Sequence, residues 1–347
     1  MSQSSTPPPQ RVLSPNDEPR EIEPGLWRIP VPLPFALRSM NIYLLADGRH
    51  GWVMVDAGLG LPADEAALRE GMRRAGVGMR DISALILTHA HPDHIGLGDV
   101  IQRESGAPVY MLSGEQDRMY LVWGPDAPNA FEPVNRMYAE HGMDAPEVEA
   151  AHRSTMRTRS VLQLPDPRTV MLVQDGDEIT LGAHRYRAIW TPGHSDFHIC
   201  LLREDGVFIA GDHVLPSITP NIGLYPEARV NPLDDYLSAL ARVRDLPARV
   251  VLPGHGRPFA ALGERAEALR QHHEERGEAI LRLVRESAGG QHAYQVAKRL
   301  FGDRLRTSDD RRFALAETLA HLEYLRYRGF VRREKREALS IYRASHD

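Results

Sequence analysis

The sequence predicts a mixed α/β fold with α+β character, on three observations. Short apolar runs bounded by Gly, Pro and Asp alternate with amphipathic segments, a pattern typical of buried strands connected by helices. Several of the apolar runs end directly in His or Asp, as strands do when their loops gather at one edge of a sheet core. A chain of 347 residues, 42% of them hydrophobic, is also long enough for one large domain and a small one.

Bulk composition argues against several classes of protein. A net charge of −5 weighs against a wholly basic nucleic-acid-binding protein, although it does not exclude a local basic patch. The single cysteine, Cys200, excludes an intramolecular disulfide and a cysteine-built metal site, and its apolar surroundings (HICLL) predict a small core residue. The chain opens without a basic-then-apolar signal sequence and holds no apolar run approaching about 18 residues. A cytoplasmic protein with no membrane partner is therefore the expectation.

The N-terminal part is expected to begin as a tail and continue as strands. Residues 1–20 are rich in Ser, Pro and Gln and predict a disordered tail. From Gly25 onward, the runs LWRIPVPLPF, NIYLLADG and WVMVDAG predict strands, with a hairpin turn at Asp47-Gly48. Asp56 ends the last of these strands, where it either caps a loop or hydrogen-bonds a metal-ligating histidine. Pro62–Ala75 predicts an amphipathic helix with proline in its first turn.

The stretch LILTHAHPDHIG, residues 85–96, organises the chain. After an apolar strand, three histidines and one aspartate fall within six positions, although the whole chain has only 16 His. Pro92 excludes a regular strand or helix interior, so these side chains belong to a strand-to-helix loop. His89 and His91 project to one side of an extended segment, while Asp93 and His94 can reach a second position nearby. Imidazole and carboxylate ligands suit zinc, iron or manganese, and the pattern predicts two metal ions.

The next segment is less regular. Leu97–Glu104 predicts a helix, and Pro108–Leu112 predicts a short strand. Between residues 113 and 169, helix-compatible pieces at Gly114–Trp123 and Pro133–His141 alternate with Pro and Gly breaks. This stretch is too long for a simple connection and predicts a helical insertion or lid. Its Met and aromatic side chains either pack the insertion on the body or line a substrate pocket.

A second strand-rich half repeats the placement of polar residues at strand ends. Strands are predicted at four runs: DGDEITLG, HRYRAIWTPGH, HICLLRED and GVFIAGDHV. A helix is expected at Asp234–Arg244, and RVVLPGHG predicts a last buried strand. His194, Asp212 and His255 each follow one of these apolar runs, and we expect one end of the sheet core to bring them to the first histidine cluster. Arg257 faces either an anionic substrate group or backbone carbonyls.

Residues 261–347 predict helix, helix, helix and hairpin, which is the order of a winged-helix domain. The helices are expected at Ala261–Ser287, Tyr294–Phe301 and Asp309–Tyr327, and FVRREKREALSIYR is expected to form the hairpin. This region holds 18 Lys or Arg against 14 Asp or Glu, which leaves a net charge of −9 for the rest of the chain. A mildly basic winged helix can touch nucleic acid, but the mixed charges favour a domain that packs on the catalytic body or dimerises.

Taken together, these motifs resemble those of the metallo-β-lactamase-fold hydrolase superfamily. Its H-x-H-x-D-H signature reads His89-Ala90-His91-Pro92-Asp93-His94, and the TPGH, GD and PGHG segments carry His194, Asp212 and His255. The match covers residues from about 25 to 260, within a predicted catalytic domain of residues 21–260. The chain looks most like the glyoxalase II-like group, and within it like β-lactamase-like 2 proteins with a C-terminal winged helix. The resemblance implies an αββα sandwich with the metals at one edge of its two sheets.

Carried over position by position, the resemblance implies a complete dinuclear site. His89, His91 and His194 would hold the first metal, Asp93, His94 and His255 would hold the second, and Asp212 would bridge both. Zn²⁺ is the expected metal, with Fe or Mn as alternatives. Asp93 would also orient the attacking hydroxide or take up its proton, and Tyr225 is a candidate oxyanion donor. His198 and His213 are either hydrogen-bond partners of metal ligands, proton donors or structural histidines.

The implied function is a dinuclear metal-dependent hydrolase that uses a metal-bound hydroxide on an ester, thioester or lactone, with a small-molecule acyl substrate. The acidic catalytic body weighs against a phosphodiester polymer as the substrate. The alternatives are a single-strand endoribonuclease of the β-lactamase-like 2 type, an iron-dependent sulfur dioxygenase-like enzyme, and a DNA-binding regulator. A homodimer is a further expectation.

Overall fold

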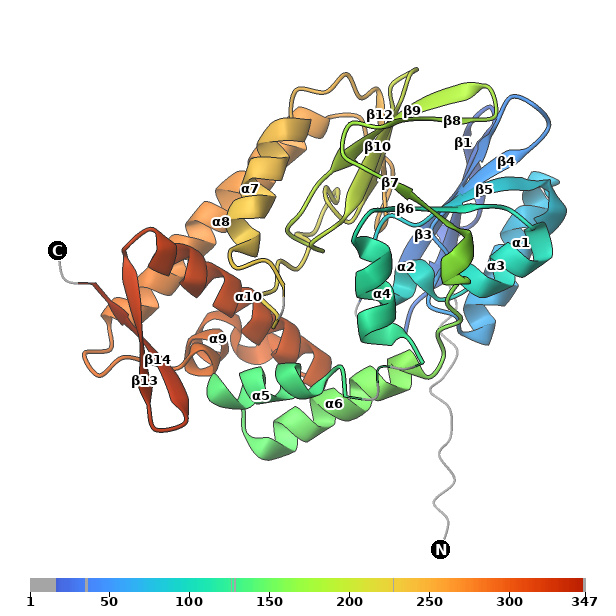
Figure 1. The fold of residues 1–347 in the computed structure, drawn as a ribbon. Helices are drawn as coiled ribbons and strands as arrows, with labels where there is room; N and C mark the ends of the chain where they lie inside the picture. Colours follow the sequence, from blue (N-terminus) through green and yellow to red (C-terminus); the bar gives the residue numbers. More distant parts are fainter. Residues whose placement is uncertain (1–16, 35–36, 126, 128, 227, 346–347) are drawn as a thin grey trace, which may run out of the picture.

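Two β-sheets packed face to face form the centre of the molecule (Figure 1). The computed structural model describes residues 17–34, 37–125, 127, 129–226 and 228–345. The tail predicted for residues 1–20 therefore lies mainly outside the described residues, and Arg20 already begins the first strand.

The first sheet, as far as the chain is described, has seven strands that are hydrogen-bonded in chain order. They are β1 (Arg20–Glu23), β2 (Leu26–Pro32), β3 (Ser39–Ala46), β4 (Trp52–Val55), β5 (Ile82–Ile86), β6 (Val109–Leu112) and β7 (Val170–Val173). Strands β1 to β4 pair antiparallel, and β4 to β7 pair parallel. Because β4 and β5 are parallel neighbours, the residues that follow them, Asp56 and Leu87–His89, lie at the same edge of the sheet.

The second sheet has the strand order β12-β11-β10-β9-β8. Its strands are β8 (Glu178–Leu181), β9 (His184–Trp190), β10 (Ile199–Arg203), β11 (Val207–Gly211) and β12 (Val250–Pro253). Neighbours pair antiparallel except β11 and β12, which are parallel. The carboxyl ends of β9, β11 and β12 therefore share one edge, and the segments that follow them carry His194, Asp212 and His255.

Helices connect the strands and cover both sheets. They are α1 (Pro62–Ala75), α2 (Pro92–Ile95), α3 (Gly98–Ser105), α4 (Glu115–Trp123), α5 (Glu132–Glu140), α6 (Ala145–Arg159), α7 (Pro232–Val243), α8 (Leu262–Arg285), α9 (Ala293–Phe301) and α10 (Ser308–Tyr327). Within the described ranges, single turns of 3₁₀-helix also occur at Met79–Asp81, Pro167–Thr169 and Gly302–Arg304. A hairpin of β13 (Val331–Arg336) and β14 (Leu339–Ala344) closes the described chain.

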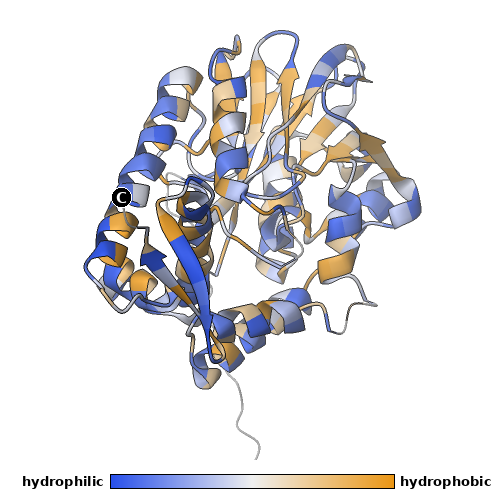
Figure 2. Ribbon diagram, turned by 60° about the vertical axis from the view of Figure 1, so that its left-hand side comes forward, coloured by the Kyte–Doolittle hydropathy of each residue, from blue (hydrophilic) through white to orange (hydrophobic). Residues whose placement is uncertain are grey.

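Three apolar cores divide the catalytic body into four layers. One core lies between the sheets and contains Tyr43, Val55, Tyr186 and Leu252 among its buried residues. A second joins the outer face of the first sheet to α1 and α3, and a third joins the outer face of the second sheet to α7 and the start of α8. Apolar colour follows the strands in Figure 2, and the helices turn polar faces outward. This order confirms the predicted αββα sandwich.

Helix α1 follows its prediction, and its ends show why. Pro62 occupies the first turn, where a missing N–H costs nothing. The buried carboxylate of Asp64 accepts hydrogen bonds from the backbone N–H groups of Leu59 and Leu61 at 3.1 and 3.0 Å. Gly76 ends the helix with φ +70°, a left-handed conformation that a side chain would disfavour.

A fourth core, at the C-terminal end, joins segments that the sequence analysis treats as separate domains. Buried residues of α5 and α6 pack with those of α9, α10 and the hairpin. Helix α8 belongs to two cores, because Leu262 and Leu269 pack on α7 whereas Ile280 and Val284 pack in the C-terminal core. Helix α8 thus begins just after the boundary predicted at residue 260 and packs on both sides of it, while the division into domains stays a prediction.

Two further findings refine the sequence-based expectations. Helix α6 is not among the helices expected from the sequence. Proline usually interrupts a helix, but Pro146 stands in the first turn of α6, where proline is tolerated. The helix, helix, helix, hairpin order of α8, α9, α10 and β13–β14 is observed, while its interpretation as a winged helix stays a prediction. In the described part of the chain, none of the helices has both the length and the apolar character needed to cross a bilayer.

A pair of helical glycines tests the packing of α1 on the first sheet. A Cβ added at Gly71 would lie 2.8 Å from Cγ1 of Ile29 in β2, whereas a Cβ at Gly277 in α8 would meet nothing within 4 Å. We expect Gly71→Ala to lower the free energy of unfolding by about 1–3 kcal/mol through overpacking. Gly277→Ala is expected to raise it by about 0.5–1 kcal/mol, because alanine favours the helix. Urea unfolding of both variants checks this, and equal stabilisation by the two would contradict the packing.

Candidate metal centre

Four loops at the carboxyl ends of strands converge at one edge of the two sheets. The loop after β5 carries His89, His91, Asp93 and His94, and the segments after β9, β11 and β12 carry the other candidates. Among the described residues, three groups have ligand atoms that all lie within 4.8 Å of one another. The groups are His89, His91 and His194; His89, His94 and Asp212; and Asp93, His94 and His255. All seven predicted metal ligands are therefore brought together.

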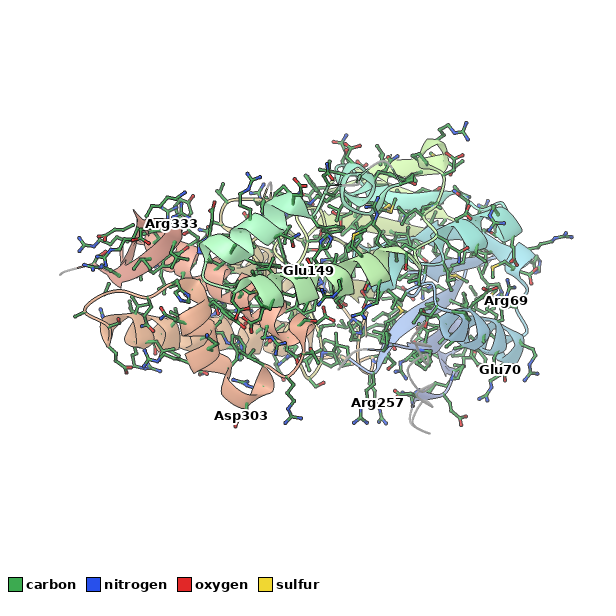
Figure 3. All side chains as sticks on the ribbon, turned by 90° about the horizontal axis from the view of Figure 1, so that it is seen from below. Arg69, Glu70, Glu149, Arg257, Asp303 and Arg333 are labelled. Atoms are coloured by element: carbon green, nitrogen blue, oxygen red, sulfur yellow. The ribbon has the colours of Figure 1, made fainter. Side chains whose placement is uncertain are left out.

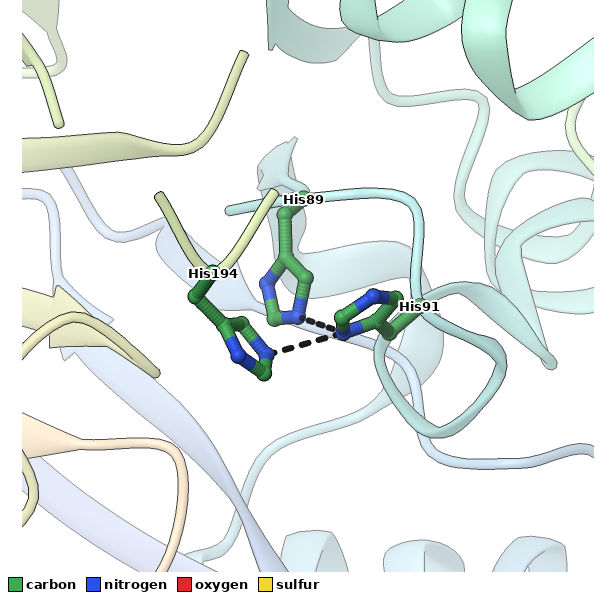
Figure 4. A group of neighbouring side chains, drawn as sticks. All are labelled: His89, His91 and His194. Carbon is green, nitrogen blue, oxygen red and sulfur yellow. Dashed lines mark hydrogen bonds between the residues drawn. The ribbon is translucent and has the colours of Figure 1, made fainter. Parts of the chain in front are cut away.

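The first group consists of three imidazoles that point toward one another (Figure 4). His91 Nδ1 lies 3.0 Å from His89 Nε2 and 2.8 Å from His194 Nε2. Burial, together with the neighbouring histidines, holds the pKa of His89 well below its usual range and lowers that of His91 to about 3. Both rings are therefore neutral at pH 7, the form in which an imidazole nitrogen offers its lone pair to a metal.

Asp212 lies between the first group and the third, which is Asp93, His94 and His255. Its Oδ2 is 3.5 Å from His194 Nε2 and 3.3 Å from His255 Nε2, and its Oδ1 is 3.6 Å from His94 Nε2. His255 Nε2 also lies 3.4 Å from Asp93 Oδ2. Burial opposes a charge on His255, but the carboxylates of Asp212 and Asp93 outweigh it and raise its pKa to about 10.

In three of the candidate ligands, the ring nitrogen that points away from the other ligands has a hydrogen-bond partner. His94 Nδ1 donates to Asp56 Oδ2 at 2.8 Å, His255 Nδ1 donates to the Ser39 carbonyl at 2.9 Å, and His194 Nδ1 donates to the Asn221 carbonyl at 2.8 Å. Because these oxygens can only accept, each Nδ1 carries a proton and each Nε2 is the atom that faces the candidate ligands. A metal ion that bound His255 or His94 would displace the proton that the neighbouring carboxylates favour on Nε2. Asp56 thus combines its two predicted roles, because it also accepts from Thr88 N of the loop after β5 at 2.8 Å.

His198 and His213 are buried and stand behind the site. Asp212 N donates to His198 Nε2 at 3.1 Å, and the other nitrogen of His198 lies 2.8 Å from Thr191 Oγ1. His198 therefore supports the backbone of Asp212. The ring of His213 packs edge-on against Tyr236 with centroids 5.2 Å apart, and the Tyr236 hydroxyl donates to the His213 carbonyl. These contacts of His213 are structural, and its role as a proton donor stays a prediction.

Tyr225 is not brought to the metal-ligand candidates by its described contacts. It packs at the edge of the C-terminal core, near Arg312 and Tyr138. The role of Tyr225 as an oxyanion donor therefore stays a prediction, because its described contacts are with the C-terminal core and not with the candidate ligands. Arg257 is exposed and projects from the surface (Figure 3).

Glu115 is a site residue that the sequence analysis missed. Its buried Oε1 accepts from Ala90 N and from Ser195 Oγ, both at 2.6 Å, so it ties the loop after β5 to the loop after β9. Burial raises the pKa of this carboxyl group. The local sequence does not indicate that Glu115 is buried at the site, because an acidic residue at the start of a helix is common.

Among the described contacts, the insertion reaches the site through α4. Trp123 Nε1 donates to the carbonyl of Ala90, between His89 and His91, at 2.9 Å. Trp123 also lines a cavity of about 520 Å³, mostly apolar, together with Tyr120, Met156 and Leu162 among others. Helices α5 and α6 instead pack in the C-terminal core, so the insertion joins the catalytic body to the C-terminal end.

Known protein families match both parts of the chain. The metallo-beta-lactamase superfamily matches residues 37–255, and the C-terminal domain of metallo-beta-lactamase-like proteins matches residues 278–344. The probable metallo-hydrolase YqjP of Bacillus subtilis is 27% identical over 322 residues, which are 90% of this chain and 93% of that protein. An atrochrysone carboxyl ACP thioesterase of Aspergillus fumigatus is 27% identical over 221 residues, which are 63% of this chain and 51% of that protein.

The fold has a close counterpart among solved structures. The crystal structure of a metallo-beta-lactamase family protein from Thermus thermophilus matches with a TM-score of 0.81 and 37% sequence identity, over 94% of this chain and 100% of that chain. The superfamily and fold predicted from the motifs are confirmed, while the glyoxalase II-like grouping stays a prediction. The chain belongs to the metallo-beta-lactamase superfamily and is a metal-binding hydrolase of that family.

Proposed function

We propose that the chain is a dinuclear metal-dependent hydrolase of a thioester, with simple esters and lactones as related substrates. The observation that carries the proposal is the position of Asp212, whose carboxylate lies within 3.6 Å of candidate ligand nitrogens of His194 in the first group and of His94 and His255 in the third. His89, His91 and His194 would hold one metal, and Asp93, His94 and His255 would hold the other. Asp212 would contact both. Imidazole and carboxylate ligands favour Zn²⁺, with Fe or Mn as alternatives.

The donor set fits bound cations. His94 Nε2, His255 Nε2 and Asp212 Oδ1 are buried without a hydrogen-bond partner among the described residues. A buried polar atom without a partner is costly, and a metal ion would satisfy all three. The seven candidates also include two carboxylates, which would offset part of the charge of two divalent ions.

The chemistry of the proposed reaction divides between the metals and the protein. Two bound metal ions would lower the pKa of a water molecule and polarise a carbonyl oxygen. Asp93 has about a sixth of its side chain exposed, which places a carboxylate where it can accept a proton from the attacking water. Asp56 and the Asn221 carbonyl hold the rings of His94 and His194 in one orientation, so the centre needs little reorganisation.

Two observations support an acyl substrate. The related Aspergillus protein is a thioesterase by name, which makes a thioester the first substrate class to test. The cavity beside α4 has none of the seven candidate ligands in its lining, but Trp123 connects it to the loop of His89 and His91. Its mostly apolar walls would suit an acyl chain better than a phosphodiester backbone.

A specific observation keeps RNA as a second candidate substrate. A groove of about 600 Å³ beside the loop at residues 217–219 is lined by Arg265, Arg276, Arg304 and His272 among others. Arginine side chains contact phosphates, so this groove could follow an RNA backbone. The apolar cavity and the thioesterase relative favour the thioester.

Loss of the metals is expected to abolish hydrolysis. Chelation followed by dialysis should remove activity, and added Zn²⁺ should restore it. Asp212→Ala should lower kcat/KM by about 100-fold or more, because the metals supply several kcal/mol of transition-state stabilisation. Metal analysis should find two equivalents in the native protein and fewer in the variant. Asp235→Ala, which removes a surface ion pair with Arg229, is the control. Unchanged turnover in Asp212→Ala would refute the dinuclear assignment.

The partner of His94 can be tested separately. Asp56 accepts from His94 Nδ1 with one oxygen and from Thr88 N with the other, and it adopts φ +63°, a conformation that asparagine tolerates. Asn has only one acceptor oxygen, so Asp56→Asn leaves one of these donors unmatched. We expect about 10- to 100-fold weaker metal binding with the fold retained, measured by chelator competition and circular dichroism. Wild-type affinity would show that Asp56 only braces the loop.

A substrate panel distinguishes the two candidate substrates. We expect measurable turnover of acyl thioesters, weaker turnover of lactones and no cleavage of labelled single-stranded RNA. Arg304→Ala in the groove should leave thioester hydrolysis unchanged. RNA cleavage that depends on Arg304, without thioester turnover, would replace the thioester with RNA as the substrate.

A further inference from the structure

The loop between Asp212 and α7 controls the orientation of one proposed metal ligand. Its residue Asn221 accepts the Nδ1–H of His194 through the backbone carbonyl at 2.8 Å. This bond turns His194 Nε2 toward His91 and Asp212, which lie at 2.8 and 3.5 Å. The direction of the ligand nitrogen therefore depends on where the backbone of Asn221 is held.

The loop has no regular structure of its own and is held by the C-terminal helices. From residue 214 to residue 226 it contains no helix or strand. Arg265 of α8 donates through Nε to the Leu215 carbonyl at 2.6 Å and through Nη2 to the Ile218 carbonyl at 2.7 Å. Leu224 N donates to the Ala316 carbonyl of α10 at 3.0 Å. The contacts thus come from the start of α8, which belongs to the four-layer body, and from α10, which lies outside it.

Asn221 itself is anchored to α10 by its side chain. Its Nδ2 lies 3.3 Å from Oε2 of Glu317 and 3.3 Å from the Phe313 carbonyl. Glu317 is 7% exposed, and its other oxygen, Oε1, forms an ion pair with Arg276 of α8. The carboxylate is therefore held at both oxygens and gives Asn221 a fixed acceptor in a buried setting, where such a charge-assisted bond is strong.

We propose that Glu317 is a positioning residue for the metal centre. Together with Arg276 it fixes Asn221, and through the Asn221 carbonyl it orients His194. The C-terminal helices would then be part of the metal site and would not serve only as an added domain. This inference rests on the proposed function, because it takes His194 as a metal ligand.

A second buried glutamate on the same helix provides a matched control. Glu323 is 3% exposed, and its carboxylate pairs with Arg326 and Arg333 and accepts from the Tyr342 hydroxyl at 2.9 Å. These partners belong to α10 and the hairpin, and no described bond links Glu323 to the loop of Asn221. Loss of Glu323 should therefore disturb the C-terminal core while leaving His194 in place.

The experiment compares metal binding with stability in the full-length protein. Glu317→Ala, Asn221→Ala and Glu323→Ala are titrated with Zn²⁺ against a chromophoric chelator, and thermal midpoints are measured in parallel. We expect Glu317→Ala and Asn221→Ala to weaken one of two Zn²⁺ equivalents by about 10- to 100-fold, as the loss of partners behind metal ligands does elsewhere. Glu323→Ala should lower the midpoint and keep both affinities. The visible spectrum of the Co²⁺ form should change only in the first two variants.

Two further variants keep the test decisive. The double variant Glu317→Ala/Asn221→Ala should bind Zn²⁺ no more weakly than the worse single variant, because both act through one path. If Glu317→Ala does not fold, Glu317→Gln, which keeps the size and one acceptor oxygen, should give an intermediate affinity. Two native affinities in folded Glu317→Ala and Asn221→Ala would overturn the inference. Failure of the native protein to bind two metals would instead refute the proposed function.

Discussion

Seven imidazole and carboxylate side chains share one largely buried volume at the edge of two sheets, and the rest of the structure serves to hold them there. Isolated polar atoms in such a place are costly, so the arrangement is stable only when cations or fixed hydrogen bonds satisfy them. Four of the seven come from the loop after β5, and the others follow β9, β11 and β12. A one-residue shift in strand register would turn the side chains of a strand to the opposite face of its sheet. The hydrogen-bond ladders of both sheets therefore determine the geometry of the candidate metal centre.

A ring of protein groups behind the ligands gives the centre its precision. Asp56 follows β4, Ser39 begins β3, and Asn221 lies in a loop fixed by α10, yet each contacts one imidazole nitrogen at 2.8–2.9 Å. Glu115, at the start of α4, ties two of the ligand loops together. The orientation of the histidines is thus shared among the first sheet, the insertion and the C-terminal helices.

The same shared construction links the catalytic body, the insertion and the C-terminal helices through packing contacts. Helix α8 packs on α7 with one end and in the C-terminal core with the other. The insertion touches the loop of His89 and His91 through Trp123, while its later helices α5 and α6 pack beside α10. The apolar cavity is lined by residues between 99 and 167, and the arginine-lined groove by residues between 217 and 304. The features that favour one substrate over another are therefore built from different parts of the chain.

The sequence by itself determined the elements whose signals are local. The run LILTHAHPDHIG predicts a strand and a ligand loop because its apolar and histidine residues are adjacent, and Pro62 with Gly76 marks both ends of α1. Only the tertiary structure decided which buried charges matter. Glu115 and Glu317 have no local signature, because burial depends on partners distant in sequence. For the same reason, the sequence does not show that Tyr225 packs on the C-terminal core. The positions of strand ends in the sequence predict where the ligands meet. The residues that orient the ligands come close to them only through tertiary packing.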